Sequence, residues 1–142
     1  MPAITLEHAN ITVTDPDRAL RFFTTALPGW RVRGGGEMDW YGKPIRWTHV
    51  GTDDVYIALQ SGGEGPGPDW QGHATGVKHL GLVVDDIDAA VARLQRDGFA
   101  VDHWGGQTAH RRSVYLMVGA DFQVELVQYL SRDAALRNAY AA

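Results

Sequence analysis

Residues 6–19 read LEHANITVTDPDRA, and residues 77–90 read VKHLGLVVDDIDAA. A shift of 71 positions (79 − 8) superimposes the two stretches and places His8 on His79. In each copy, polar and apolar residues alternate before an aspartate-rich turn, which is typical of a strand that leads into a capped helix. The sequence therefore predicts one structural unit that occurs twice.

The first unit continues with a helix and three short strands. Alternation predicts that Ala9, Ile11 and Val13 share one face of the first strand, and that His8, Asn10 and Thr12 share the other. The helix should start after a cap at Thr14 or Asp15, with an inward stripe of Leu20, Phe23 and Leu27. Strands are expected around 30–34, 45–50 and 55–60, separated by glycine-rich turns.

The second unit repeats this order. We predict a strand at 77–84, a helix at 86–97 with Ile87, Val91 and Leu94 inward, and strands near 100–104, 112–117 and 122–129. Residues 61–76 are rich in glycine and proline, which indicates a linker. Residues 130–142 form either a short helix capped by Ser131 or a loose tail. The prediction is an α+β fold of two tandem βαβββ modules, at about 4–60 and 77–129.

Composition limits the classes of function. A chain of 142 residues, 44% hydrophobic and 21% charged, fits a single globular domain over 1–142. A net charge of −4 with scattered basic residues argues against nucleic-acid binding. We see neither a bilayer-spanning apolar run nor a secretory signal, and there is no cysteine, so we expect a cytoplasmic protein without disulfides.

The leading stretches of the modules carry a resemblance to a known family. EHANITVTDPDRALRFF at 7–23 and KHLGLVVDDIDAAVARL at 78–94 resemble the vicinal oxygen chelate superfamily, also called the glyoxalase/bleomycin-resistance/dioxygenase superfamily. The resemblance extends from about Ile4 to Tyr129. It implies that each module folds into a curved half-barrel with helices outside, and that paired modules close a cup. It also implies that metal ligands project into this cup from the first and last strands of each module.

By this resemblance, the ligand positions are His8, His79 and, in DFQVELVQY, Glu125. The fourth position falls on Ala58 in DVYIALQS, and alanine cannot bind a metal. Two imidazoles and one carboxylate form a facial triad that suits Fe, Mn, Ni, Co or Zn. The expected cofactor is therefore a divalent transition metal, and the alternative is a relative that binds organic ligands without one.

Further candidates surround this set. Tyr115 falls where ring-cleaving members carry a hydrogen-bonding tyrosine, and their histidine position falls on Gly106, so that His110 or His103 would have to substitute. We expect Glu125, Tyr115 and His110 to be catalytic. Asn10 on the polar strand face and Trp47 as a pocket wall are expected substrate contacts. Arg111 and Arg112 could both hold an anionic substrate, but adjacent strand residues face opposite ways, so only one points inward, and we expect it to be Arg112.

The resemblance implies a metal-dependent enzyme that chelates neighbouring oxygens of a small substrate. We favour glyoxalase-like lyase or isomerase chemistry, with Glu125 as ligand and base, although the loss at Ala58 argues against lactoylglutathione itself. The alternatives are an Fe(II) extradiol dioxygenase and an antibiotic-resistance protein, either a fosfomycin-type transferase or a bleomycin-type binder. Small members of the family often pair, so we expect a homodimer, without a nucleic-acid or membrane partner.

Overall fold

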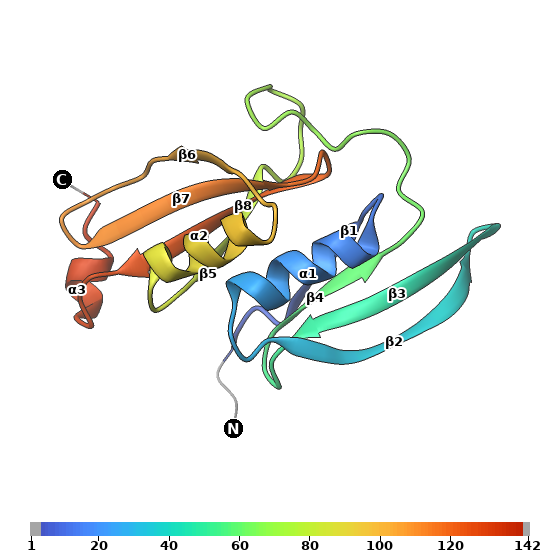
Figure 1. Cartoon of the computed structure of the whole chain (residues 1–142), viewed down its shortest axis with the longest axis horizontal. Coiled ribbons are helices and arrows are strands. Elements are labelled where there is room, and N and C mark those ends of the chain that lie inside the picture. The colour runs from blue at the N-terminus through green and yellow to red at the C-terminus, as the bar shows by residue number, and fades with distance from the viewer. Residues whose placement is uncertain (1–3, 141–142) are drawn as a thin grey trace. The chain divides into compact units, whose positions relative to one another are not determined.

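The computed structural model describes residues 4–140 (Figure 1). The chain divides into two compact units, the first ending at Gly65 and the second beginning at Pro66, inside the predicted linker. Both contain a βαβββ module with a four-stranded mixed sheet, which confirms the predicted repeat and the α+β class.

The first unit is built from β1 (His8–Thr12), α1 (Pro16–Ala26), β2 (Arg31–Trp40), β3 (Lys43–Gly51) and β4 (Tyr56–Gln60). Its strand order is β1-β4-β3-β2. Strands β1 and β4 are parallel and the other pairs are antiparallel. Helix α1 packs on one face of this sheet through β3 and β4, as Figure 1 shows.

The second unit contains β5 (His79–Val83), α2 (Ile87–Arg96), β6 (Val101–Trp104), β7 (Arg111–Val118), β8 (Phe122–Tyr129) and the short α3 (Ala134–Arg137). Its order, β5-β8-β7-β6, repeats that of the first unit, again with one parallel pair, β5 and β8. Helix α2 contacts β7 and β8. The other face of the sheet is thereby left to the polar residues of β5, β7 and β8.

Both helices start as the sequence predicts. Asp15 accepts a hydrogen bond from Arg18 N at 3.0 Å, and Asp86 accepts one from Ala89 N at the same distance. Each carboxylate satisfies a backbone N–H that the helix leaves free. The buried residues of α1 are Ala19, Phe22, Phe23 and Ala26, and those of α2 are Ile87, Ala90, Val91 and Leu94. Leu20 is only half-buried, because the inward stripe of α1 is centred on the two phenylalanines.

Two details differ from the prediction. Strand β2 continues to Trp40 instead of ending at Gly34, because the glycines at 34–36 pair with β3 rather than forming a turn. The Trp47 ring lies over this segment: a Cβ on Gly36 would be 3.0 Å from it. The helix α3 is capped by Asp133, not by Ser131, whose hydroxyl accepts from Asp133 N at 3.1 Å.

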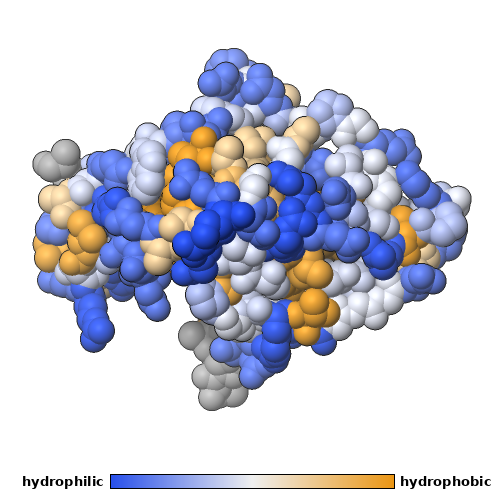
Figure 2. Space-filling model, in the orientation of Figure 1, coloured by the Kyte–Doolittle hydropathy of each residue, from blue (hydrophilic) through white to orange (hydrophobic). Residues whose placement is uncertain are grey.

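The described surface carries separate apolar residues. Figure 2 shows hydrophobic areas divided by hydrophilic ones on the face in view. Exposed large apolar side chains include Val32, Met38, Trp40 and Trp104. No helix within residues 4–140 is long and apolar enough to cross a membrane.

Candidate functional site

The site of the second unit forms where β5, β7 and β8 lie side by side. Gly81 and Tyr115 are the cross-strand partners of Glu125 on its two sides. His79 lies opposite Gln123, two residues before Glu125 and therefore on the same face of β8. The sheet thus brings the predicted pair together: His79 Nε2 lies 3.2 Å from Glu125 Oε2.

The Glu125 carboxylate is buried and held from several sides. Its other oxygen, Oε1, accepts from Arg111 Nη2 at 2.8 Å and from Ser113 Oγ at 2.8 Å. The Tyr115 hydroxyl also hydrogen-bonds to the carboxylate. The Glu125 side chain is 8% exposed, so that these partners replace most of its water.

These contacts fix the protonation states of the site. Burial alone would raise the pKa of Glu125, but hydrogen bonds from Ser113, Arg111 and Tyr115 outweigh it and hold the pKa below its ordinary value. Burial and the neighbouring Glu125 carboxylate raise the pKa of Tyr115. Glu125 is therefore an anion at neutral pH, and Tyr115 is a neutral donor beside it.

A row of stacked rings continues from Tyr115 to β6. The His103 ring lies parallel to the Tyr115 ring with 4.5 Å between centroids, and Trp70 stacks on the far side of His103 at 4.9 Å. His103 Nδ1 lies 2.6 Å from Asp102 Oδ2. His79 meets Tyr115 edge-on at 5.3 Å. The second unit thus brings two imidazoles against one tyrosine.

A cavity of about 290 Å³ opens beside Glu125. It is lined by Gly106, Thr108, Arg111, Tyr115, Glu125, Tyr129, Arg137, Ala139 and Tyr140. The strands β7 and β8, the turn before β7 and the segment that follows α3 therefore all contribute to its wall. A cavity of this volume is suited to a small ligand.

In the first unit, His8 belongs to a different cluster. Its Nδ1 lies 2.9 Å from Glu7 Oε1, and its ring stacks on Tyr56 at 4.7 Å. Tyr56 also stacks on His49 at 4.5 Å, and the Arg33 guanidinium lies 4.3 Å from the Tyr56 ring centroid. Burial, Arg33 and His8 lower the pKa of His49. His8 and His49 thus both stack on Tyr56, and Glu7 is the carboxylate of this first-unit cluster.

Strand pairing supports the predicted match of Ala58 to Glu125. His8 is opposite Tyr56 and Asn10 opposite Ala58 in the first unit, as His79 is opposite Gln123 and Gly81 opposite Glu125 in the second. On the next strand, His49 pairs with Ala58 as Tyr115 pairs with Glu125. The carboxylate position of the first unit is therefore alanine, with a histidine across from it.

Of the predicted substrate contacts, only Arg112 belongs to the second unit. Asn10 and Trp47 belong to the first unit, where Asn10 is exposed and the Trp47 ring lies 4.8 Å from His49. Arg112 projects from β7 toward α2 and donates to Asp88 from its two terminal guanidinium nitrogens, at 2.8 and 3.0 Å. The arginine that reaches Glu125 is thus Arg111, not Arg112.

His110 lies in the turn before β7, where its N–H donates to Thr108 Oγ1 at 3.1 Å and its carbonyl accepts from Leu130 N. It is outside the set of described residues that line the cavity.

The contacts of Arg111 and Ser113 with Glu125 were not predicted from the sequence. Strand alternation could have predicted these contacts, because residues of one strand that are an even number of positions apart share a face. If Tyr115 faces Glu125, then Ser113 and Arg111 face it too and Arg112 does not. His103 follows from the pairing of β6 with β7, which places it opposite Tyr115.

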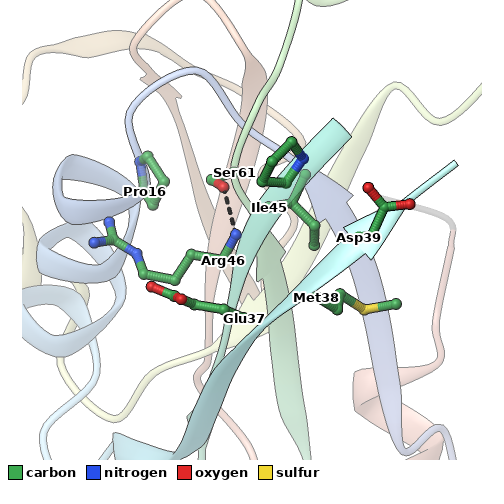
Figure 3. A pocket seen from close by; sticks show the side chains of 8 residues that line it. Pro16, Glu37, Met38, Asp39, Ile45, Arg46 and Ser61 are labelled. Carbon is green, nitrogen blue, oxygen red and sulfur yellow. Dashed lines mark hydrogen bonds between the residues drawn. The ribbon is translucent and has the colours of Figure 1, made fainter. Parts of the chain in front are cut away.

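The first unit has a larger hollow of about 620 Å³, drawn in Figure 3. It lies between the start of α1 and the β2–β3 hairpin, and Arg46 extends across it toward Pro16. Arg46 N donates to Ser61 Oγ at 2.8 Å, and its guanidinium lies 3.4 Å from Asp17. The described residues that line this hollow include none of the predicted site residues.

The donor atoms of the second unit suit two positions on a metal. Two ligands at right angles, each about 2.1 Å from a metal, lie about 3.0 Å apart. The 3.2 Å between His79 Nε2 and Glu125 Oε2 is close to this spacing. Within residues 4–140, no group of three His, Asp or Glu side chains is gathered that could hold a metal. The second unit therefore supplies a two-residue donor set.

Comparison with known proteins identifies the family. Residues 5–113 match the model of the Glyoxalase/Bleomycin resistance protein/Dioxygenase superfamily, which is more than half of the chain. The chain belongs to this superfamily. The name of the superfamily covers two kinds of enzyme and one kind of resistance protein. A comparison with curated proteins finds no match.

Solved structures of the superfamily share the fold. A glyoxalase family protein from Bacillus cereus is 17% identical, with 92% of this chain and 97% of that chain covered and a TM-score of 0.74. A glyoxylase/bleomycin resistance protein/dioxygenase domain from Frankia is 20% identical, with 90% and 99% covered and a TM-score of 0.70.

A point mutant of the fosfomycin resistance protein FosX from Listeria monocytogenes, in complex with Mn(II) and a dihydroxypropylphosphonic acid, is 13% identical, with 97% and 100% covered and a TM-score of 0.68. At these identities the likeness shows the fold of this chain and not its activity.

Proposed function

We propose that this superfamily member is a metal-dependent enzyme that acts on neighbouring oxygens of a small substrate, with glyoxalase-like lyase or isomerase chemistry. The observation that carries the proposal is the buried Glu125 carboxylate, held ionised beside His79 Nε2 at 3.2 Å. In this proposal His79 and Glu125 bind the metal, and His8 stays the sequence-based prediction for a third ligand. A divalent metal bound there would supply Lewis-acid polarisation of the substrate oxygens.

The residues around Glu125 have separate roles in the proposed reaction. A lowered pKa makes a carboxylate a good ligand and a poor proton acceptor, so a base other than Glu125 is needed. We assign this role to His103, whose Nδ1 contacts Asp102 and whose ring stacks on Tyr115. Tyr115 remains protonated and donates a hydrogen bond, while Arg111 keeps Glu125 in place.

A second candidate is an Fe(II) extradiol dioxygenase, which a separate observation favours. The sequence has glycine where ring-cleaving relatives are expected to have a histidine. The structure nevertheless stacks His103 on Tyr115, the tyrosine that hydrogen-bonds to Glu125. This arrangement would suit a catecholate and O₂ bound side by side.

The first test is the metal content of the purified chain, together with His79→Ala, Glu125→Ala and His8→Ala. His73→Ala is the matched control, because His73 is exposed in the segment before β5. We expect a near-stoichiometric transition metal that is lost in the three site variants and kept in the control. Retention in His79→Ala or Glu125→Ala, or a wild-type protein that takes up no metal, would refute the proposal.

The substrate class is tested on the loaded protein. Anaerobic reconstitution with Fe(II), followed by catechols and air, gives a yellow ring-cleavage product only for the dioxygenase. Hemithioacetals of 2-oxoaldehydes test the glyoxalase-like reaction. Loss of turnover in His103→Gln with retained metal would support His103 as the base, whereas unchanged turnover would refute this assignment.

The proposal includes a homodimer. The exposed apolar residues Val32, Met38 and Trp40 all lie on β2, the edge strand of the first unit. Light scattering on the purified chain should give twice the monomer mass of 15.6 kDa. A monomer at micromolar concentration would contradict this part.

A further inference from the structure

The wall of the cavity beside Glu125 carries two arginines and one carboxylate, and therefore one positive charge in excess. Arg111 and Arg137 both line it, and Glu125 is the carboxylate in its wall. Arg111 uses Nη2 for Glu125, Nε for Ser113 at 3.2 Å and Nη1 for the Tyr129 hydroxyl at 3.4 Å. Each of its three guanidinium nitrogens thus has a partner, and the charge of Glu125 is balanced.

Arg137 is the second cation. Its Cζ lies 5.5 Å from the Tyr129 ring centroid, and Arg111 Cζ lies 5.8 Å from the same centroid. Within residues 4–140, Arg137 forms no ion pair. Asp85 lines a neighbouring hollow together with Arg137, but the two side chains are not paired. A guanidinium without a carboxylate at a cavity wall is suited to a ligand anion.

We propose that this cavity binds a small organic carboxylate, most favourably an aromatic one, with its anionic group on Arg137. A monoanion matches the one uncompensated charge. A planar carboxylate can also accept two parallel N–H bonds from a guanidinium. Tyr115, Tyr129 and Tyr140 add aromatic rings to the wall of this cavity. Glu125 and Arg137 line the same cavity of about 290 Å³, so that one small ligand can contact both.

This inference assigns a substrate class to the site proposed above and rests on that proposal. The oxygens to be transformed would lie at the Glu125 end, and the carboxylate would hold the opposite end at Arg137. The segment after α3, which contributes Ala139 and Tyr140, would then form part of the substrate site. The C-terminal residues would serve recognition rather than the chemical step.

The test is calorimetric titration of the full chain with benzoate, with phenylphosphonate as a dianion and benzyl alcohol as a neutral analogue. We expect saturable benzoate binding that Arg137→Gln weakens at least about tenfold, the value of one charge-assisted hydrogen bond. Arg132→Gln is the matched control. The substitution removes the same charge, and Arg132 is exposed and lines only the neighbouring hollow. It should change the affinity by less than about twofold.

Several results would overturn the inference: no benzoate binding by the wild type, equal affinity in Arg137→Gln, or equal binding of benzyl alcohol or phenylphosphonate. Circular dichroism and the metal content of Arg137→Gln, both expected unchanged, control for folding. Titration of metal-free and Mn(II)-loaded protein separates the two proposals. Arg137-dependent binding without any metal uptake would refute the metal-dependent function alone, whereas metal uptake without benzoate binding would refute this inference alone.

Discussion

Replacing Arg111 by glutamine removes the positive partner of a buried carboxylate. Breaking such a pair costs about 3–5 kcal/mol when both groups are fully buried. The Arg111 side chain is 29% exposed, and Ser113 and Tyr115 still bind Glu125, so we expect a loss of about 2 kcal/mol in the free energy of unfolding. Arg112→Gln, which breaks a pair with the exposed Asp88 on the opposite face, should cost less than about 1 kcal/mol.

The loss should depend on pH. The pKa of Glu125 is depressed in the folded protein, so its contribution is fully present above its ordinary value of 4.5 and is lost as the pH falls through the folded value. The pKa of Glu125 rises toward the ordinary value in Arg111→Gln, and the difference between variant and wild type should therefore shrink in acid.

Urea unfolding followed by circular dichroism at about pH 7 and about pH 4 measures the difference in free energy of unfolding between Arg111→Gln and the wild type. A double-mutant cycle with Glu125→Gln should give a coupling energy of about 1–2 kcal/mol at neutral pH. The same loss at both pH values, with no coupling, would refute the reasoning.

Three further predictions concern the first unit. Gly51→Ala should lower the free energy of unfolding in urea by about 2 kcal/mol or more, because the new Cβ would lie 2.1 Å from Val55 O. A Cβ at Gly34 meets nothing within 4 Å, so Gly34→Ala should change the free energy of unfolding by less than about 0.5 kcal/mol, and equal effects of the two variants would contradict the turn geometry. Phe22→Ala should cost about 3–5 kcal/mol, since Phe22 is 0% exposed, and a loss below 1 kcal/mol would place it outside the core. In an NMR titration His49 should have a midpoint below 6.5, and Arg33→Gln should raise it; a wild-type midpoint above 6.5 would exclude the burial and charge effects described.

Local rules predicted most of the fold. Asp15 and Asp86 each precede a helix and act as its cap, and the alternation around His8 gives the strand its two faces. The predicted end of the second strand was wrong, because the turn preference of glycine there competes with strand pairing. Glycines at 34–36 suggest a turn, yet they continue β2, because cross-strand bonds to β3 and the ring of Trp47 hold them extended.

The candidate site was predicted in part. The repeat pointed to His79 and the family resemblance to Glu125, and the sheet brings them to 3.2 Å. The choice of Arg112 over Arg111 ignored the parity of β7 relative to Tyr115. The contribution of Arg137 could not be found from the sequence, because it depends on how the segment after β8 returns over the sheet.

The empty carboxylate position at Ala58 also limits how this protein could be redesigned. The strand pairings match Arg111 and Ser113 of the second unit with Ile45 and Trp47 of the first, since Trp47 pairs with Gln60 as Ser113 pairs with Val127. A glutamate introduced at position 58 would therefore lack the two partners that β7 gives to Glu125. The duplicated halves are therefore no longer interchangeable parts, and reinstating the lost acid would require at least three concerted substitutions.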